Sequence, residues 1–121
     1  MNTAVHKTRK NFVKFDDEHY LLYLDEQPAE YAEPESEETV AGFSYTGTET
    51  DGGTLIEAKD VTAENRRAKF ISGLIGTRYT IDAQIAVLAN GKDTNEHKAE
   101  LNAFEAFRAD CKASVDELLA R

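Results

Sequence analysis

The chain has little cysteine and proline and no long apolar run. Among its 121 residues there is one cysteine, Cys111, so no internal disulfide can form and nothing argues for secretion. No stretch approaches the roughly 18 apolar residues that a membrane-spanning helix needs. The basic first ten residues are not followed by the apolar run of a signal peptide. We therefore expect a cytoplasmic protein without a membrane partner.

Patterns typical of metal and catalytic sites are also missing. None of the three histidines, His6, His19 and His97, has a neighbour at a spacing typical of zinc sites. Gly-rich nucleotide-binding loops and the EF-hand spacing are absent. Cys111 lies on the apolar side of the last expected helix, which predicts a core residue rather than a nucleophile. The sequence thus predicts no catalytic residue, metal or cofactor, and we expect the protein not to be an enzyme.

Basic residues are scarce in one half of the chain. Residues 1–60 carry 5 basic and 14 acidic side chains, whereas residues 61–121 carry 9 of each, so the net charge of −9 comes from the first half. That half repels a phosphate backbone, which argues against nucleic acid as a partner. Seven of the fifteen residues in segment 25–39 are acidic, and the segment holds both prolines. This composition predicts a mobile acidic loop, whose role in function or solubility stays open.

The rest of the first half, over residues 11–60, has the two-residue period of β-strands. Residues 11–15 and 20–24 predict a hairpin, and residues 40–46 and 54–58 predict a second one around an Asp-Gly turn. Residues 1–10 show little apolar pattern and are expected to be a flexible arm.

From residue 61 onward the apolar residues recur with a helical period. The expected helices are Thr62–Arg78, Thr80–Asn90 and a third of about 25 residues that begins with a capping box at Asp93 and Glu96. The second helix carries Ile81, Ile85 and Leu88 on one side. The apolar stripe of the third consists of Leu101, Phe104, Cys111, Val115 and Leu118, with Phe107 beside them. Two antiparallel hairpins followed by three helices predict a single α+β domain over residues 1–121.

Two groups of residues are candidates for a partner surface. In the second strand, apolar side chains alternate onto both faces, which is typical of a strand buried on both sides or facing a partner. These residues are Tyr20, Leu21, Leu22, Tyr23 and Leu24. The second group is a basic cluster at the start of the first helix, where positive charge is unfavourable. Arg66, Arg67 and Lys69 are therefore expected to form a solvated face, to pair with the acidic loop or to bind an acidic partner.

Small residues recur every four positions in the first helix, at Ala68, Ser72 and Gly76. Such a stripe lets another helix or the sheet approach closely. The run Gly73-Leu74-Ile75-Gly76 has the Gly-x-x-Gly spacing of KH domains, which clamp a nucleic-acid backbone. Its middle residues are apolar and lie in an expected helix, so packing is the favoured interpretation.

The order of several segments resembles a known group of proteins. These segments are Phe43-Ser44-Tyr45-Thr46-Gly47, Asp51-Gly52-Gly53-Thr54-Leu55, the helix end Arg78-Tyr79-Thr80, Ile85-Ala86-Val87-Leu88, and a final helix with Phe104, Phe107, Cys111 and Lys112. Over residues 40–118 the chain resembles small, mostly uncharacterised proteins encoded in prophage or tail-gene regions of gut Bacteroides-type bacteria. The group has no established catalytic residue. The resemblance implies a virion-associated or assembly role.

These observations favour a non-enzymatic protein-interaction or structural module, such as a phage tail accessory or assembly protein. Its expected partner is another protein or a second copy of the chain, bound through the Tyr20–Leu24 strand or the long last helix. The alternative is an acidic inhibitor that mimics nucleic acid and occupies a basic protein, which the charge of residues 1–60 supports.

Overall fold

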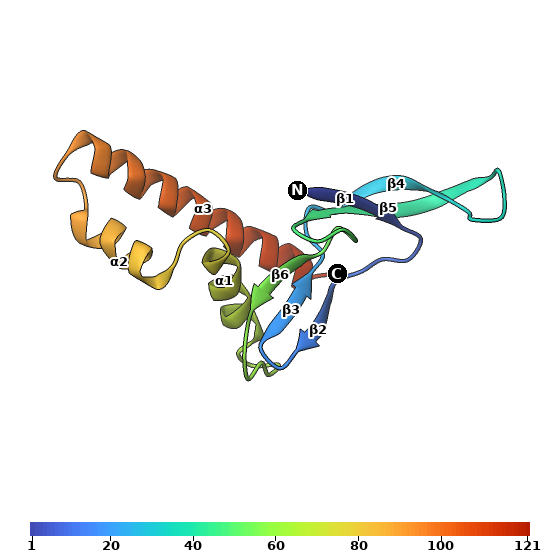
Figure 1. The fold of residues 1–121 in the computed structure, drawn as a ribbon, viewed down its shortest axis with the longest axis horizontal. Coiled ribbons are helices and arrows are strands. Elements are labelled where there is room, and N and C mark those ends of the chain that lie inside the picture. Colours follow the sequence, from blue (N-terminus) through green and yellow to red (C-terminus); the bar gives the residue numbers. More distant parts are fainter.

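The computed structural model describes residues 1–121, which form two small sheets and three helices (Figure 1). The strands are β1 (Asn2–His6), β2 (Phe12–Asp16), β3 (His19–Leu22), β4 (Gln27–Ala32), β5 (Thr39–Gly47) and β6 (Thr54–Glu57). They form two antiparallel three-stranded sheets, in the orders β1-β5-β4 and β2-β3-β6. The helices are α1 (Arg66–Gly76), α2 (Ile81–Asn90) and α3 (Asn95–Leu119). The predicted α+β class, with a long last helix, is confirmed.

One of the two predicted hairpins is present. β2 pairs with β3, with Val13 opposite Leu21. The other prediction is wrong, because β5 lies between β1 and β4 while β6 pairs with β3. The turn between β5 and β6 therefore carries the chain from one sheet to the other. Gly52 in this turn has φ 86°, and a Cβ there would lie 2.6 Å from the Tyr45 carbonyl oxygen, so only glycine fits.

Two segments that the sequence predicts to be irregular are strands instead. The arm predicted over residues 1–10 contains β1, which pairs with β5 and places Ala4 opposite Tyr45. The loop predicted over residues 25–39 contains β4, which pairs with the other edge of β5. Of the predicted loop, only residues 33–38 connect β4 to β5 without belonging to a strand. The nine residues of β5 present backbone groups along both edges, so a polar segment can pair on each side, and this pairing overrides the weak strand propensity of those segments.

The core lies between sheet β2-β3-β6 and the helices α1 and α3. Phe70 at its centre is fully buried and packs against the rings of Phe12 and Tyr20, each at a centroid distance of 5.2 Å. The predicted stripe of α3 is confirmed, since Leu101, Phe104, Cys111, Val115 and Leu118 are all buried. α1 packs beside β6 (Figure 1).

The helix ends follow the predicted capping chemistry with shifts of a few residues. α1 begins after Asn65, whose side chain accepts a hydrogen bond from the Thr62 amide while Thr62 Oγ1 accepts one from the Asn65 amide. Thr80 caps α2 as predicted. α3 is capped by Thr94 rather than by Asp93, because the Thr94 hydroxyl accepts the His97 amide at 3.1 Å.

Candidate protein-interaction surface

Helix α2 is apolar on two sides but covered on only one. Asp82 is its single charged residue, and none of its ten residues is buried. Val87 packs against the core. On the outer side, Ile81, Ile85 and Leu88 are 71%, 59% and 60% exposed. Their i, i+4, i+7 spacing places them on one face, and we call these three residues the α2 stripe. The prediction that they share a side is confirmed, but that side faces away from the core.

α2 and the first half of α3 form a helical hairpin that projects from the body of the molecule (Figure 1). Two features of the sequence define the ends of α2. Thr80 Oγ1 accepts the Ala83 amide at 3.0 Å, and Gly91 adopts φ 58° after the last turn. The hairpin therefore holds the α2 stripe at one end of the long axis, away from the sheet β1-β5-β4 at the other end (Figure 1).

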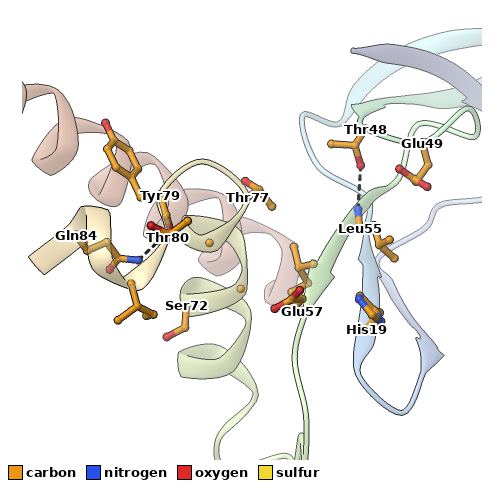
Figure 2. Close-up of a pocket in the computed structure, with 14 residues that line it drawn as sticks. His19, Thr48, Glu49, Leu55, Glu57, Ser72, Thr77, Tyr79, Thr80 and Gln84 are labelled. Carbon is orange, nitrogen blue, oxygen red and sulfur yellow. Dashed lines mark hydrogen bonds between the residues drawn. The ribbon is translucent and has the colours of Figure 1, made fainter.

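A groove of about 750 Å³ begins at Ile81 and crosses α1 to the sheet β2-β3-β6 (Figure 2). Its floor is the outer face of α1, which presents Ser72, Gly73 and Gly76. A Cβ at Gly76 would meet no atom within 4 Å, so this part of the floor is open. The walls are formed by Tyr79, Thr80, Ile81 and Gln84 on one side and by Thr48, Glu49, Leu55 and Glu57 on the other. The groove continues the apolar surface of the α2 stripe towards the sheet.

Hydrogen bonds hold both walls of the groove in place (Figure 2). The Leu55 amide donates to Thr48 Oγ1 at 3.1 Å, and Gln84 Nε2 donates to the Tyr79 carbonyl at 3.2 Å. Glu49 and Glu57 are the charged residues of the lining, and no lysine or arginine lines the groove. The wall formed by the sheet is therefore mildly acidic, whereas the wall formed by α2 is neutral.

The predicted small-residue stripe of α1 does not make the close contact expected of it. The close approach occurs at Gly73, where a Cβ would lie 2.5 Å from the Glu57 carbonyl oxygen of β6. Ala68, Ser72 and Gly76 are exposed. The four-residue spacing identifies a face without large side chains, but within the chain that face is left uncovered, and two of its residues form the floor of the groove.

The strand run predicted as a partner surface is mostly used inside the chain. Leu22, Tyr23 and Leu24 are buried, and Tyr20 and Leu21 are half-buried. Tyr20 contacts Phe70 in the core, as alternation predicts for the inner face.

The outer face of the same sheet keeps some apolar exposure. Leu21 lies between Val13 on β2 and Leu55 on β6 in the strand register. Val13 is exposed, and Phe15 on the same strand is 60% exposed. Of the predicted strand, Leu21 is thus the residue that contributes to an accessible apolar face.

The basic cluster of α1 packs against other parts of the fold. Arg67 donates two hydrogen bonds to Asp116 of α3, at 2.6 and 3.1 Å, and these bonds hold the pKa of Asp116 below its usual value. The Arg66 guanidinium lies over the Phe12 ring at 4.8 Å, and Lys69 is half-buried. Of the three roles that the sequence leaves open for the cluster, pairing with the acidic segment 25–39 is not found for Arg67, because Asp116 of α3 supplies its carboxylate.

A buried charge cluster joins the two sheets. The Arg121 side chain is 2% exposed, and its Nη1 donates to the carbonyl oxygens of Lys10 and Tyr23 at 2.9 and 2.5 Å. Glu26 lies 3.5 Å from Arg121 and accepts hydrogen bonds from Arg9 and from the Tyr45 hydroxyl. Burial alone would raise the pKa of Glu26, but these donors hold it below its usual value. The hydrogen-bond and ion-pair partners of this cluster lie within the chain, so the cluster stabilises the junction between the two sheets.

Tyr23 and Asp51 form a second polar contact at the same junction. The Tyr23 hydroxyl donates to Asp51 Oδ2 at 2.7 Å, and burial together with this bond raises the pKa of Tyr23 to about 12. His6 Nε2 lies 2.7 Å from the Asp51 carbonyl oxygen, and its ring packs edge-on against Tyr23. Asp51 also accepts the Gly53 amide, which agrees with the turn role predicted for it.

The remaining residues with reactive side chains lie apart from one another. Cys111 is buried in the core, as predicted, and burial raises the pKa of its thiol to about 11. His19 pairs with Asp16, and His97 pairs with Asp93. No three or more His, Cys, Asp or Glu side chains lie close enough together to hold a metal ion. None of the helices combines the length and the apolar character needed to cross a bilayer.

The chain matches no family model, no curated protein and no solved structure. The resemblance to phage tail-region proteins therefore stays a prediction.

Sequence reasoning missed the α2 stripe as a candidate surface, although the signal was present. Ten residues with a single charge, Asp82, form a helix that is apolar nearly all round. Helices of this kind are normally covered on more than one side. A hairpin of two helices offers α2 only one covered side, so the exposed stripe follows from composition together with the small number of helices.

We expect the free energy of unfolding to fall as the pH rises from about 9 to about 12. In the folded chain the pKa of Cys111 is about 11 and that of Tyr23 about 12, compared with 9.0 and 10.0 for the free side chains. Above the lower values the unfolded chain loses protons that the folded chain keeps, so the folded state loses relative stability. Urea unfolding should show a loss of about 4 kcal/mol between neutral pH and a pH of 11, to which Cys111 contributes more than Tyr23.

Two variants identify the residues that cause this loss of stability at alkaline pH. Tyr23→Phe and Cys111→Ala each remove one ionisable group, so each should flatten part of the pH dependence, Cys111→Ala at the lower pH. A wild-type stability that stays constant up to pH 11 would contradict the prediction.

Proposed function

We propose that the protein is a non-enzymatic protein-interaction module that binds through the α2 stripe and the adjoining groove. The observation that carries the proposal is a ten-residue helix with no buried residue and three large apolar side chains in a row on its outer face. Contiguous exposed apolar surface in small soluble proteins marks interaction sites. A helix of this length is only marginally stable by itself, so a partner on its open side would also stabilise it.

The resemblance of residues 40–118 to phage tail-region proteins supports an accessory or assembly role as the setting of this binding. A module of this kind contributes contacts between chains rather than chemistry. The projecting α2–α3 hairpin suits such a contact, because it presents the stripe clear of the two sheets (Figure 1).

Site-specific photo-crosslinking in the expressing cell tests the proposal. A photo-reactive amino acid at position 85 should give adducts of higher mass, because Ile85 is the middle residue of the stripe. The same group at Glu105, an exposed position of α3, is the matched control and should give few. Mass spectrometry then identifies the attached chain. Equal, low yields at both positions would refute the proposal.

The same experiment evaluates the acidic mimic as the second candidate. The structure favours it in one respect, because the acidic segment follows an ordered strand and lies at the tip of the β4–β5 hairpin (Figure 1). Glu35 lies in that tip. A photo-reactive group at position 35 that captures a basic protein, with no adduct at position 85, would replace the proposed function by the mimic.

A further inference from the structure

We propose that the partner bound by the α2 stripe is a second copy of this chain, in a two-fold dimer. The inference rests on the proposed function, because it names the partner of the same surface. The stripe is complementary to itself when two α2 helices cross in antiparallel directions. Ile81 of one copy then meets Leu88 of the other, and Ile85 lies at the two-fold axis beside Ile85 of the second copy. A two-fold interface needs this kind of self-complementary patch.

The distribution of charge favours a second copy over an unrelated partner. α2 has one charged residue, Asp82, so the stripe offers a strongly charged partner little to pair with. Residues 61–121 carry equal numbers of acidic and basic side chains, while the whole excess of −9 lies in residues 1–60. Contact through the α2–α3 hairpins keeps the acidic segments 25–39 of the two copies apart, because the sheet β1-β5-β4, which carries them, lies at the far end of the molecule (Figure 1). Repulsion over such separations is largely screened.

The groove offers space and charge for the end of the second copy's helix. In the antiparallel arrangement, Leu88 of the second copy lies over Ile81 and so at the start of the groove, where Gly76 leaves the floor open. Lys92 follows α2 and forms no ion pair within its own chain. In the dimer it extends over the groove of the other copy, whose far wall carries Glu49 and Glu57. Each copy thus supplies both the apolar contact and the complementary charge.

Sedimentation of the purified chain tests the dimer directly. The wild-type chain should sediment at twice the single-chain mass of 13.5 kDa. Ile85→Ser should convert it to a monomer with unchanged circular dichroism. Phe15→Ser is the matched control, because Phe15 is as exposed as Ile85 but lies on the outer face of the sheet, and it should leave the dimer intact. Lys92→Glu should weaken the association.

Disulfide trapping tests the geometry without relying on a disruptive variant. In a Cys111→Ala background, Ile85→Cys should cross-link to itself under mild oxidation, because a disulfide needs Cβ atoms about 4 Å apart. Ile81→Cys and Leu88→Cys should cross-link when the two chains are mixed and much less when each is alone. A Glu105→Cys chain should remain uncrosslinked. Cross-linking of Leu88→Cys with itself in preference to Ile81→Cys would overturn the antiparallel arrangement.

The outcomes separate this inference from the proposed function. A wild-type chain that remains monomeric at high protein concentration overturns the dimer. If position 85 still captures a different protein in the cell, the interaction module stands and only its partner changes. A monomeric chain with no adduct at position 85 overturns both.

Discussion

Replacing Arg121 with alanine is expected to lower the free energy of unfolding by about 3 kcal/mol. The guanidinium is almost completely buried and reaches the Lys10 and Tyr23 carbonyls, the Glu26 carboxylate and Glu117. It also stacks over the Tyr45 ring at 5.4 Å. The substitution removes the guanidinium donor from two part-buried carbonyl oxygens, of which the Lys10 carbonyl keeps only a longer contact of 3.3 Å with the Tyr45 hydroxyl. It also leaves Glu26 with less compensating charge, and both changes destabilise the folded state. Urea unfolding followed by circular dichroism measures the loss.

Arg9→Ala is the matched control for this prediction. Arg9 bonds the same Glu26 carboxylate, but its side chain is half exposed, so solvent can replace much of what it contributes. We expect a clearly smaller loss for Arg9→Ala than for Arg121→Ala. Arg121→Lys should recover little, because an ammonium group lacks the planar fork that reaches several acceptors at once. Equal losses in the free energy of unfolding for Arg9→Ala and Arg121→Ala would show that burial of the side chain does not determine how much each arginine stabilises the fold.

The helical half of the fold could be predicted closely because its signals are local. The Thr80 cap, Gly91 after the last turn of α2 and the apolar stripe of α3 each depend on residues within one or two turns. The β2–β3 hairpin could also be predicted, but the partners of β5 and β6 could not, because they depend on contacts between distant residues. Arg121 shows the same limit. Nothing near it in the sequence indicates that its side chain lies between two sheets.

The sequence predicts that the three residues of the α2 stripe share one face of a helix, but it does not predict that this face is exposed. The spacing of Ile81, Ile85 and Leu88 identifies a helix face, but a face of this kind usually points into the core. The structure directs Val87 towards the core instead, because α2 has only α3 to pack against. The run Tyr20–Leu24 shows the opposite case. Its apolar side chains on both faces suggest a surface for a partner, but most of them are buried against the two sheets and two helices of the same chain.

Gly73→Val is expected to destabilise the fold by about 3 kcal/mol, while Gly76→Val changes stability by less than about 0.5 kcal/mol. The two glycines lie three residues apart in α1, Gly73 in the interior and Gly76 as the last residue, and a change of helix propensity of less than about 1 kcal/mol at either position is too small to explain the expected difference. A Cβ at Gly73 would lie 2.5 Å from the Glu57 carbonyl oxygen and 3.0 Å from Ile56 Cδ1, so α1 would have to move away from β6. A Cβ at Gly76 meets open space.

Urea unfolding at low protein concentration, where the proposed dimer would dissociate, separates the two variants. The close approach at Gly73 fixes the position of α1 against the sheet. Because α1 is held in this position, its exposed face forms the floor of the groove. Gly73→Val should therefore alter the near-UV circular dichroism of the core as well as the stability, whereas Gly76→Val should alter neither and only fill the groove. Similar losses of stability for both glycines would mean that contact with β6 does not determine the effect at Gly73, and would remove the structural reason for the groove.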